Sequence, residues 1–293
     1  MANPDQSITP NTFLALDPNK HSLASSRVVL LPAPYDATTS YKHGARYGPA
    51  AIIAASVEME DFDPELACEP MAVGIHTAPE LDTNAADPEK MANRVSEAIA
   101  FYTERGKLVG MLGGEHSLSA GAVRTMANSY VDLSVLVFDA QADLRDQYQG
   151  MAYSHACASR RMLDHAPVTL VGVRSMTGEE KSFASEQKIA MFERGAEPIT
   201  DIEAIVGRLS DHVYVSFDLD AFDPSFMAGV GTPEPGGMGW WEALRILRAV
   251  AEHKTIVGFD VMELAPAEGP EASAYTAAKL TYKMIGYATQ LGG

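Results

Sequence analysis

Short apolar runs recur six times along this chain, and they restrict its fold more than any other feature of the sequence. Each run is rich in β-favouring residues and closes at glycine, proline or a charged residue. Such near-continuous runs are typical of parallel strands covered on both faces, whereas a half-exposed sheet alternates apolar and polar residues. The six runs are residues 27–32, 107–112, 134–138, 168–173, 212–217 and 255–259.

Amphipathic stretches with a helical period lie between these runs. They are residues 87–105, 117–129, 240–253 and 271–291. This alternation predicts a doubly wound α/β fold, with three α/β/α layers around a mostly parallel central sheet. Turn-forming residues without sustained periodicity mark residues 1–26 as a loosely held N-terminal arm. No linker, repeat or low-complexity tract divides residues 27–293, so we expect these residues to form a single domain.

The excess of acidic residues narrows the possible partners. With 22 Lys and Arg against 39 Asp and Glu, the formal net charge is −17. A field of this sign repels phosphate groups, which argues against nucleic acid and anionic membranes, and it favours a cationic small-molecule substrate. The more ordinary interpretation is that most of these charges only keep the surface hydrated.

Cysteine use and hydropathy are typical of a cytoplasmic protein. The two cysteines, Cys68 and Cys157, lie in contexts that exclude a disulfide scaffold and a zinc ribbon. No apolar run approaches the roughly 20 residues that a membrane helix needs. Residues 1–6 do not resemble a secretory signal. We therefore expect a cytoplasmic location and no membrane partner.

Carboxylate and amide side chains follow two of the apolar runs directly. Asp139, Gln141 and Asp143 follow the third run, and residues two apart in an extended chain share one face. Asp218 and Asp220 follow the fifth run with the same spacing. Taken singly, a strand-terminal aspartate is more often a helix N-cap or turn residue than a ligand.

A histidine follows the second run, where His116 comes after Gly113 and Gly114. On its own, such a histidine is more often structural than a ligand. Ligands of open α/β sheets bind beyond the carboxyl ends of the strands, which is where these runs meet. Four aspartates and a histidine at that edge match a site for Mn²⁺-like divalent cations. Shared carboxylates can bridge two ions about 3.5–4 Å apart, which then activate water.

The motifs at the strand ends resemble those of the ureohydrolase (arginase/agmatinase) superfamily. Its members carry G-G-[DE]-H-S, D-A-H-x-D and S-x-D-x-D-x-x-D-P in this order, which here are residues 113–117, 139–143 and 216–224. The resemblance covers nearly the whole chain after the arm and is closer to agmatinase-type members than to arginase. Further matching segments are residues 41–49, 153–156, 231–237 and 260–263.

The resemblance implies a metal site with two ions of manganese or nickel. The residues matching the ligands of the first ion are His116, Asp139, Asp143 and Asp218. The second ion would share two of these carboxylates, Asp139 and Asp218, and would be completed by Asp220 and residue 141.

The resemblance also implies how catalysis would proceed. A bridging hydroxide would attack the guanidinium carbon, with Asp143 orienting it. Glu263 matches the carboxylate that pairs with the planar guanidinium. His155 matches the residue that passes a proton to the departing amine. Without the resemblance, a loop histidine with no catalytic part would be the preferred interpretation of His155.

Gln141 departs from the superfamily pattern, which has histidine at this position. A neutral amide oxygen is a poorer ligand for a Mn²⁺- or Ni²⁺-class ion than an imidazole nitrogen. Loss of even an outer partner of a ligand typically costs about 10–100-fold in metal affinity or activity. We therefore expect the second ion to be weak or absent, while the first keeps all its matched ligands.

Two functions remain open. The chain is either a metal-dependent amidinohydrolase that releases urea or a substituted urea, or a catalytically impaired subunit that supports an active homologous chain in a hetero-oligomer. For the enzyme, agmatine, guanidinobutyrate, guanidine or a biguanide would each be an admissible substrate. The resemblance also implies a trimer or hexamer. A third possibility is that Gln141 was introduced deliberately to trap a complex.

Overall fold

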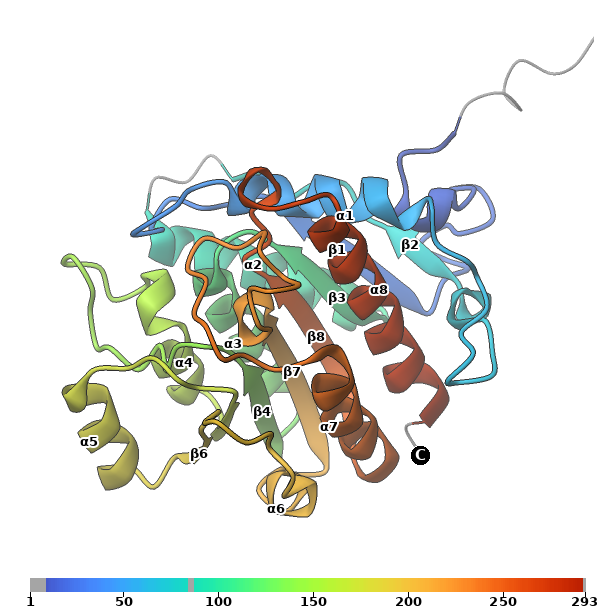
Figure 1. The fold of residues 1–293 in the computed structure, drawn as a ribbon. Helices are drawn as coiled ribbons and strands as arrows, with labels where there is room; N and C mark the ends of the chain where they lie inside the picture. The colour runs from blue at the N-terminus through green and yellow to red at the C-terminus, as the bar shows by residue number, and fades with distance from the viewer. Residues whose placement is uncertain (1–8, 84–86, 292–293) are drawn as a thin grey trace, which may run out of the picture.

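Eight parallel strands form the central layer of the protein (Figure 1). The computed structural model describes residues 9–83 and 87–291. The strand order is β2-β1-β3-β8-β7-β4-β5-β6, and every neighbouring pair is parallel. The strands are β1 (Val28–Ala33), β2 (Ile75–Thr77), β3 (Leu108–Gly113), β4 (Leu133–Phe138), β5 (Val168–Val171), β6 (Ala190–Phe192), β7 (His212–Asp218) and β8 (Thr255–Met262).

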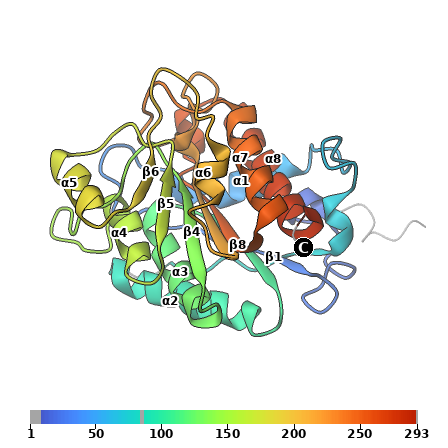
Figure 2. The same cartoon turned by 90° about the horizontal axis from the view of Figure 1, so that it is seen from below.

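Helices cover both faces of this sheet. Helices α1, α6, α7 and α8 pack on one face, and α2, α3, α4 and α5 pack on the other (Figure 2). Their bounds are α1 (Gly48–Ser56), α2 (Pro88–Thr103), α3 (Ser119–Ser129), α4 (Ala158–Leu163), α5 (Gly178–Glu186), α6 (Ile202–Val206), α7 (Trp240–His253) and α8 (Ala272–Gly286). Among the helices of the described residues, none combines the length and apolarity needed to cross a membrane.

Two-sided burial explains the continuous apolar runs. Every residue of β4 is buried. Leu136 and Phe138 belong to the core beneath α6–α8, while Val135 and Val137 belong to the core beneath α2–α5. Because fully burying such a side chain contributes about 1.5–3 kcal/mol, a polar residue on either face would be costly.

The predicted three-layer fold with a mostly parallel sheet is confirmed. All six apolar runs are strands, and the helix predicted for residues 240–253 has those bounds in the structure. The stretch predicted as one helix over residues 271–291 changes at residue 287, where α8 gives way to a π-helical segment, Tyr287–Leu291.

The prediction missed the shortest elements of the fold. Strands β2 and β6 have three residues each and lie at the two edges of the sheet, so neither carries a long apolar run. Helix α1 is built mainly of alanine, isoleucine and glycine, and it has no polar face that would give an amphipathic period.

The described part of the N-terminal arm lies against the domain. Phe13 is fully buried, and its ring centroid lies 6.4 Å from that of Tyr282 in α8. Its backbone N–H donates to Thr77 Oγ1 at 2.9 Å, and Leu14 N–H donates to Ser56 Oγ at 2.8 Å. These contacts tether the arm to β2, α1 and α8. The domain boundary after residue 26 stays a prediction, and residues 1–8 of the arm lie outside the described residues.

A buried lysine joins α8 to the segment that follows α1. Lys283 Nζ donates to Asp63 Oδ1 at 2.7 Å and to Glu65 Oε2 at 2.5 Å. Tyr287 and Arg248 also donate to the Glu65 carboxylate. Burial by itself raises the pKa of Asp63 and Glu65, but the hydrogen bonds from Lys283 and its neighbours outweigh it and hold both pKa values below their ordinary ones.

We predict that Lys283→Met lowers the free energy of unfolding by about 3 kcal/mol at pH 7, because it leaves the buried Asp63 carboxylate without its charged partner and removes one of the donors to Glu65. The two lowered pKa values mean that the ion pairs stabilise the fold above an unfolded carboxylate pKa of about 4. This contribution is lost as the pH falls through the folded values. The difference between wild type and variant, measured by urea denaturation, should therefore shrink from pH 7 to pH 3.

Lys279→Met is the matched control, since Lys279 lies one turn earlier on α8 and stacks over the Tyr282 ring. Its effect should stay below about 1 kcal/mol at every pH, as for a surface substitution. A Lys283→Met deficit that is as large at pH 3 as at pH 7 would contradict the assignment of the stability to these ion pairs.

Candidate metal centre

The carboxyl ends of the four central strands lead directly into the candidate site. β3 ends at Gly113, three residues before His116, and β4 ends immediately before Asp139. β7 ends at Asp218, and β8 ends immediately before Glu263. Because β3, β8, β7 and β4 are successive neighbours in the sheet, these residues meet at one edge.

A tight backbone contact fixes the turn that carries His116. A Cβ atom on Gly114 would lie 1.9 Å from the carbonyl oxygen of Tyr35, so only glycine fits there. Gly114 N–H donates to Ala33 O at 3.0 Å, and Glu115 N–H donates to Tyr35 O at 2.7 Å. These bonds start a 3-10 turn, His116–Leu118, and the His116 ring is fully buried at the sheet edge.

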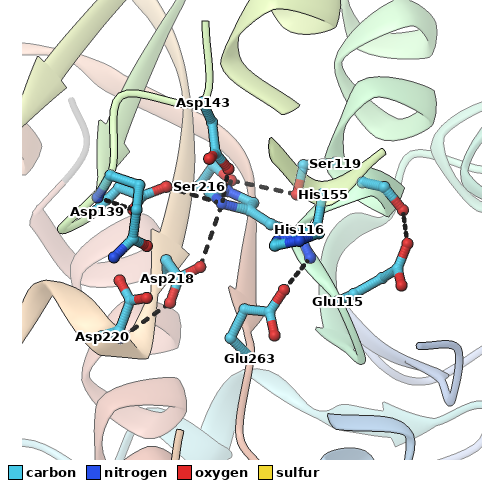
Figure 3. A network of polar contacts seen from close by, with 12 residues as sticks. Glu115, His116, Ser119, Asp139, Asp143, His155, Ser216, Asp218, Asp220 and Glu263 are labelled. Carbon is cyan, nitrogen blue, oxygen red and sulfur yellow. Dashed lines mark hydrogen bonds and ion pairs between the residues drawn. The ribbon is translucent and has the colours of Figure 1, made fainter. Parts of the chain in front are cut away.

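Three carboxylates converge on one nitrogen of His116 (Figure 3). Its Nδ1 lies 3.0 Å from Asp139 Oδ2, 3.3 Å from Asp218 Oδ2 and 3.6 Å from Asp143 Oδ2. Atoms of His116, Asp139 and Asp218 are close enough together to bind a single metal ion. The structure thus brings together the four residues predicted to bind the first ion.

The other nitrogen of His116 fixes which tautomer faces these carboxylates. Nε2 lies 2.9 Å from Ser216 Oγ, which donates to Asp260 Oδ1 at 2.7 Å. Because the Ser216 hydroxyl proton points to Asp260, the serine accepts a hydrogen bond from Nε2–H. A neutral His116 therefore presents the lone pair of Nδ1 to the cluster, and the Ser216–Asp260 pair is the kind of support that metal-binding histidines receive.

The electrostatics of the cluster favour a cation. Burial and the neighbouring carboxylates raise the pKa of Asp143, Asp218 and Asp220, and they raise the pKa of Asp139 to about 6. His116 Nδ1 and Asp139 Oδ2 are buried, and neither has a hydrogen-bond partner in acceptable geometry among the described residues. A divalent ion fits this set, because it would join the orphaned atoms and compensate the like charges.

Two residues of the site have a backbone conformation that is rare outside glycine. Asp143 has φ 50° and Glu263 has φ 67°. Such positions cost about 1–3 kcal/mol each and persist where the surroundings enforce them, often at functional sites. Glu263 N–H donates to Gly114 O at 2.8 Å, and its Oε1 accepts from His116 N–H at 2.7 Å. Burial and the charge of Asp218 raise the pKa of Glu263.

The second predicted ion position differs from the first, because its carboxylate already has hydrogen-bond donors. Asp220 Oδ1 accepts from Ala140 N–H at 3.1 Å, and Asp220 Oδ2 accepts from Thr232 Oγ1 at 3.0 Å. With its amide nitrogen turned toward the acids, Gln141 also donates to Asp220 Oδ2 at 2.7 Å and to Asp139 Oδ1 at 3.3 Å. The opposite orientation would direct the amide oxygen at these acceptors, which requires a cation between them.

A cavity of about 440 Å³ opens beside the cluster. Gln141, Asp143 and His155 line it, so the cavity connects the candidate ligands with the predicted proton-transfer residue. Burial and the charge of His116 lower the pKa of His155 to about 4, so His155 is neutral at pH 7. The same cavity is lined by two further carboxylates, Glu180 and Glu234.

Several residues that organise this edge were not predicted from the sequence pattern. The guanidinium of Arg174 donates to the backbone carbonyls of residues 172, 220–222, 234 and 235 and so holds the loop that carries Asp220. Thr38 and Ser40 contact His155 from a segment more than a hundred residues away. These roles depend on contacts between segments that are remote in the sequence. Thr232 differs in lying within residues 231–237, which had matched the superfamily.

Comparison with known sequences gives close matches over nearly the whole chain. The sequence model of the arginase family matches residues 26–286. An N(1)-aminopropylagmatine ureohydrolase of Synechocystis sp. is 41% identical over 276 residues, which cover 91% of this chain and 90% of that protein. An agmatinase of Pyrococcus horikoshii is 37% identical over 264 residues, covering 88% of this chain and 90% of that protein.

Solved structures share the fold. The agmatine ureohydrolase of Thermoplasma volcanium superposes with a TM-score of 0.87 at 28% identity, covering 97% of this chain and 96% of that one. The proclavaminate amidino hydrolase of Streptomyces clavuligerus gives a TM-score of 0.85 at 26% identity, covering 98% and 99%.

We predict that Mn²⁺ raises the thermal midpoint Tm of the metal-stripped protein, because the clustered carboxylates gain a counter-charge only in the folded chain. At a free metal concentration 100 times the Kd, the stabilisation should be about 2.7 kcal/mol. Differential scanning fluorimetry after treatment with EDTA measures the shift. His116→Ala should abolish it, whereas His253→Ala, an exposed histidine on α7, should retain it. A full shift in His116→Ala would contradict the location of the site.

Proposed function

Because the chain belongs to the arginase family, we propose that it is a metal-dependent amidinohydrolase that cleaves a C–N bond of a guanidino compound and releases urea or a substituted urea. This proposal rests on one observation, the convergence of Asp139, Asp143 and Asp218 on His116 Nδ1. A buried set of this composition is suited to Mn²⁺ or Ni²⁺. The cavity beside it gives a guanidino group access to the reacting position.

The first ion would be held by His116, Asp139, Asp143 and Asp218. When bound, the ion supplies a hydroxide nucleophile from water at neutral pH. The Asp143 carboxylate would accept a hydrogen bond from this nucleophile and so orient it. Asp143, which has a positive φ, lines the wall of the cavity.

Glu263 would bind the guanidinium. Its Oε1 already accepts from His116 N–H, so Oε2 is the oxygen that would face the substrate. Burial and the charge of Asp218 raise the pKa of Glu263, and a guanidinium that enters the site would favour the charged form, because an opposite charge nearby stabilises a carboxylate. The pairing would hold the guanidino carbon next to the carboxylate cluster.

His155 would transfer the proton that completes the reaction. The water oxygen bonds to the guanidino carbon, the C–N bond to the leaving group breaks, and the departing amine takes up a proton. At pH 7 the imidazole of His155 is neutral, so it first accepts a proton released from water and then delivers it to the amine. The products are urea and a protonated amine.

The cavity favours a substrate with a second positive charge. Asp143, Glu180 and Glu234 line it together with one cationic side chain, Arg145, which stacks at 5.1 Å over the Tyr148 ring. We propose agmatine or an aminopropyl-extended agmatine, in line with the names of the relatives from Synechocystis sp. and Pyrococcus horikoshii. Guanidinobutyrate carries a carboxylate at its far end and would be repelled, while guanidine and biguanides would leave much of the cavity unused.

The second ion position is proposed to be weak because of Gln141. Hydrogen bonds from Ala140 and Thr232 reach both oxygens of Asp220 without an ion, and Gln141 adds another when its amide nitrogen faces the acids. An alternative follows from the same observation: the chain is a catalytically impaired subunit that supports an active homologous chain. We expect a trimer or hexamer in either case, and a cytoplasmic location.

We predict that the purified chain, loaded with Mn²⁺ or Ni²⁺, releases urea from agmatine or its aminopropyl derivative, and that kcat/KM for guanidinobutyrate is at least about 10-fold lower, since one like-charge contact costs more than 1.4 kcal/mol. Asp143→Asn should lower kcat by about 10²–10⁴-fold. Colorimetric urea release measures both. Equal rates for the cationic and anionic substrates would overturn the substrate proposal, and no urea from any of them would overturn the enzymatic one.

We predict fewer than two tightly bound ions per chain, with Gln141→His raising both occupancy and rate. The physical reason is that imidazole supplies a ligand atom where the amide supplies hydrogen bonds. Elemental analysis after gel filtration gives the stoichiometry, and Gln187→His, at an exposed position after α5, is the matched control. Two tight ions in the wild type would refute this account of Gln141. If Gln141→His stays inactive while a homologous chain restores urea release, the partner-subunit function is correct.

A further inference from the structure

The buried carboxylate of Glu115 connects the turn that carries His116 with the predicted proton-transfer residue, His155. Glu115 is fully buried and directly precedes His116 in the chain. In the view of Figure 3, Glu115 lies on the opposite side of His116 from Asp139 and Asp220. Its Oε2 accepts from Thr38 N–H at 2.6 Å, and its Oε1 accepts from Thr38 Oγ1 at 2.6 Å. Both oxygens of Glu115 therefore bond to Thr38, and Oε1 also accepts from the Ser117 hydroxyl.

Thr38 links Glu115 to His155 through hydrogen bonds. Its hydroxyl proton goes to Glu115, because a carboxylate oxygen only accepts. The Thr38 oxygen can then accept the backbone N–H of His155, which lies 2.9 Å away. Thr38 is itself buried, with 4% of its surface exposed, so water does not compete for these bonds.

Ser40 contacts the His155 ring from the same segment. Its Oγ lies 3.1 Å from His155 Nε2, two residues after Thr38. Tyr148 meets the ring edge-on, at a centroid distance of 6.3 Å. One short segment thus touches His155 at its backbone and at its imidazole, and Glu115 anchors that segment beside His116.

A simpler role for Thr38 would be to satisfy an N–H group at the start of the 3-10 turn His155–Cys157, as capping groups do. That role explains the bond to the His155 backbone. It does not explain the bond from Ser40 to the ring, nor why both oxygens of a buried carboxylate next to a metal-ligand residue hold the same threonine.

We propose that Glu115, Thr38 and Ser40 form a bracket that positions the His155 imidazole for proton transfer to the departing amine. This inference rests on the proposed amidinohydrolase function. The three residues do not touch the reacting atoms, so they are positioning residues. Because the bracket begins at the residue before His116, it sets the place of the proton-transfer group relative to the metal ligands. A displacement of about 1 Å at a reacting group can cost about 10²-fold in rate.

The isosteric pair Thr38→Val and Thr38→Ser tests the bracket. Thr38→Val removes the hydroxyl and keeps the volume, so we expect kcat to fall by about 10–100-fold with KM changed less than two-fold. Thr38→Ser keeps the hydroxyl and should stay within about three-fold of wild type, a small effect for a conservative change. Thr39→Val is the matched control, because the Thr39 hydroxyl contacts His43 and not His155. Urea release from the best substrate and metal content are measured for every variant.

A double-mutant cycle separates positioning from a purely structural role. In a His155→Ala background, Thr38→Val should cause no further loss of kcat, since the group that it positions is gone. Added imidazole should raise the kcat of His155→Ala and of Thr38→Val, but not that of wild type. Ser40→Ala changes an exposed side chain and should show the same loss and the same rescue, and it keeps the test valid if Thr38→Val does not fold.

Full kcat in both Thr38→Val and Ser40→Ala overturns the bracket. So does an equal loss from Thr38→Val with and without His155, which would indicate a structural effect only. A wild type that binds metal but hydrolyses no guanidino compound overturns the proposed function first, and this is read before any variant is made.

Discussion

Buried negative charge that needs a positive partner is the constraint on which the rest of this structure depends. Three aspartates surround one imidazole nitrogen at the edge of the sheet, and burial together with mutual repulsion raises their pKa values. Burial alone would lower the pKa of His116, but Asp139 and Asp218 raise it well above its ordinary value. The cluster thus favours binding of a positive charge, either a proton or a metal ion. A divalent cation meets this demand better than one proton, because it interacts with all of the carboxylates at once.

Contacts around the cluster hold its carboxylates and His116 in fixed positions. The missing side chain of Gly114 lets the β3 turn pack on the Tyr35 backbone, and Arg174 joins carbonyl groups from separate loops around Asp220. Asp143 and Glu263 keep strained backbone conformations. A site whose supporting groups are fixed in this way loses little free energy to rearrangement when substrate binds, which is the physical meaning of preorganisation.

The sequence predicted those parts of the fold and site that follow from local rules. Continuous apolar runs are a direct consequence of burial on two faces, so the central strands were predicted, while the edge strands β2 and β6 were too short to carry the signal. The positions of Asp139 and Asp218 directly after apolar runs predicted that they would meet at one edge of the sheet. Arg174, Thr38 and Ser40 could not be predicted, because their roles arise only when segments remote in sequence come into contact. The direction of the Gln141 amide depends in the same way on the positions of Asp139 and Asp220.

Gln141 shows how one uncharged residue can change a metal site without changing its formal charge. An imidazole that turns its lone pair toward Asp139 and Asp220 needs an ion held between them, whereas an amide can offer its oxygen to an ion or its two N–H groups to the carboxylates. Rotating one torsion by half a turn exchanges these states. Hydrogen bonds to charged acceptors contribute about 1.5–3 kcal/mol each, so giving up two of them weakens ion binding by roughly 10²–10⁴-fold. His116 Nδ1 and Asp139 Oδ2 have no such internal donors in acceptable geometry among the described residues, so the first ion has no competitor of this kind. From these contacts we expect the same sheet edge to bind one ion more strongly than the other.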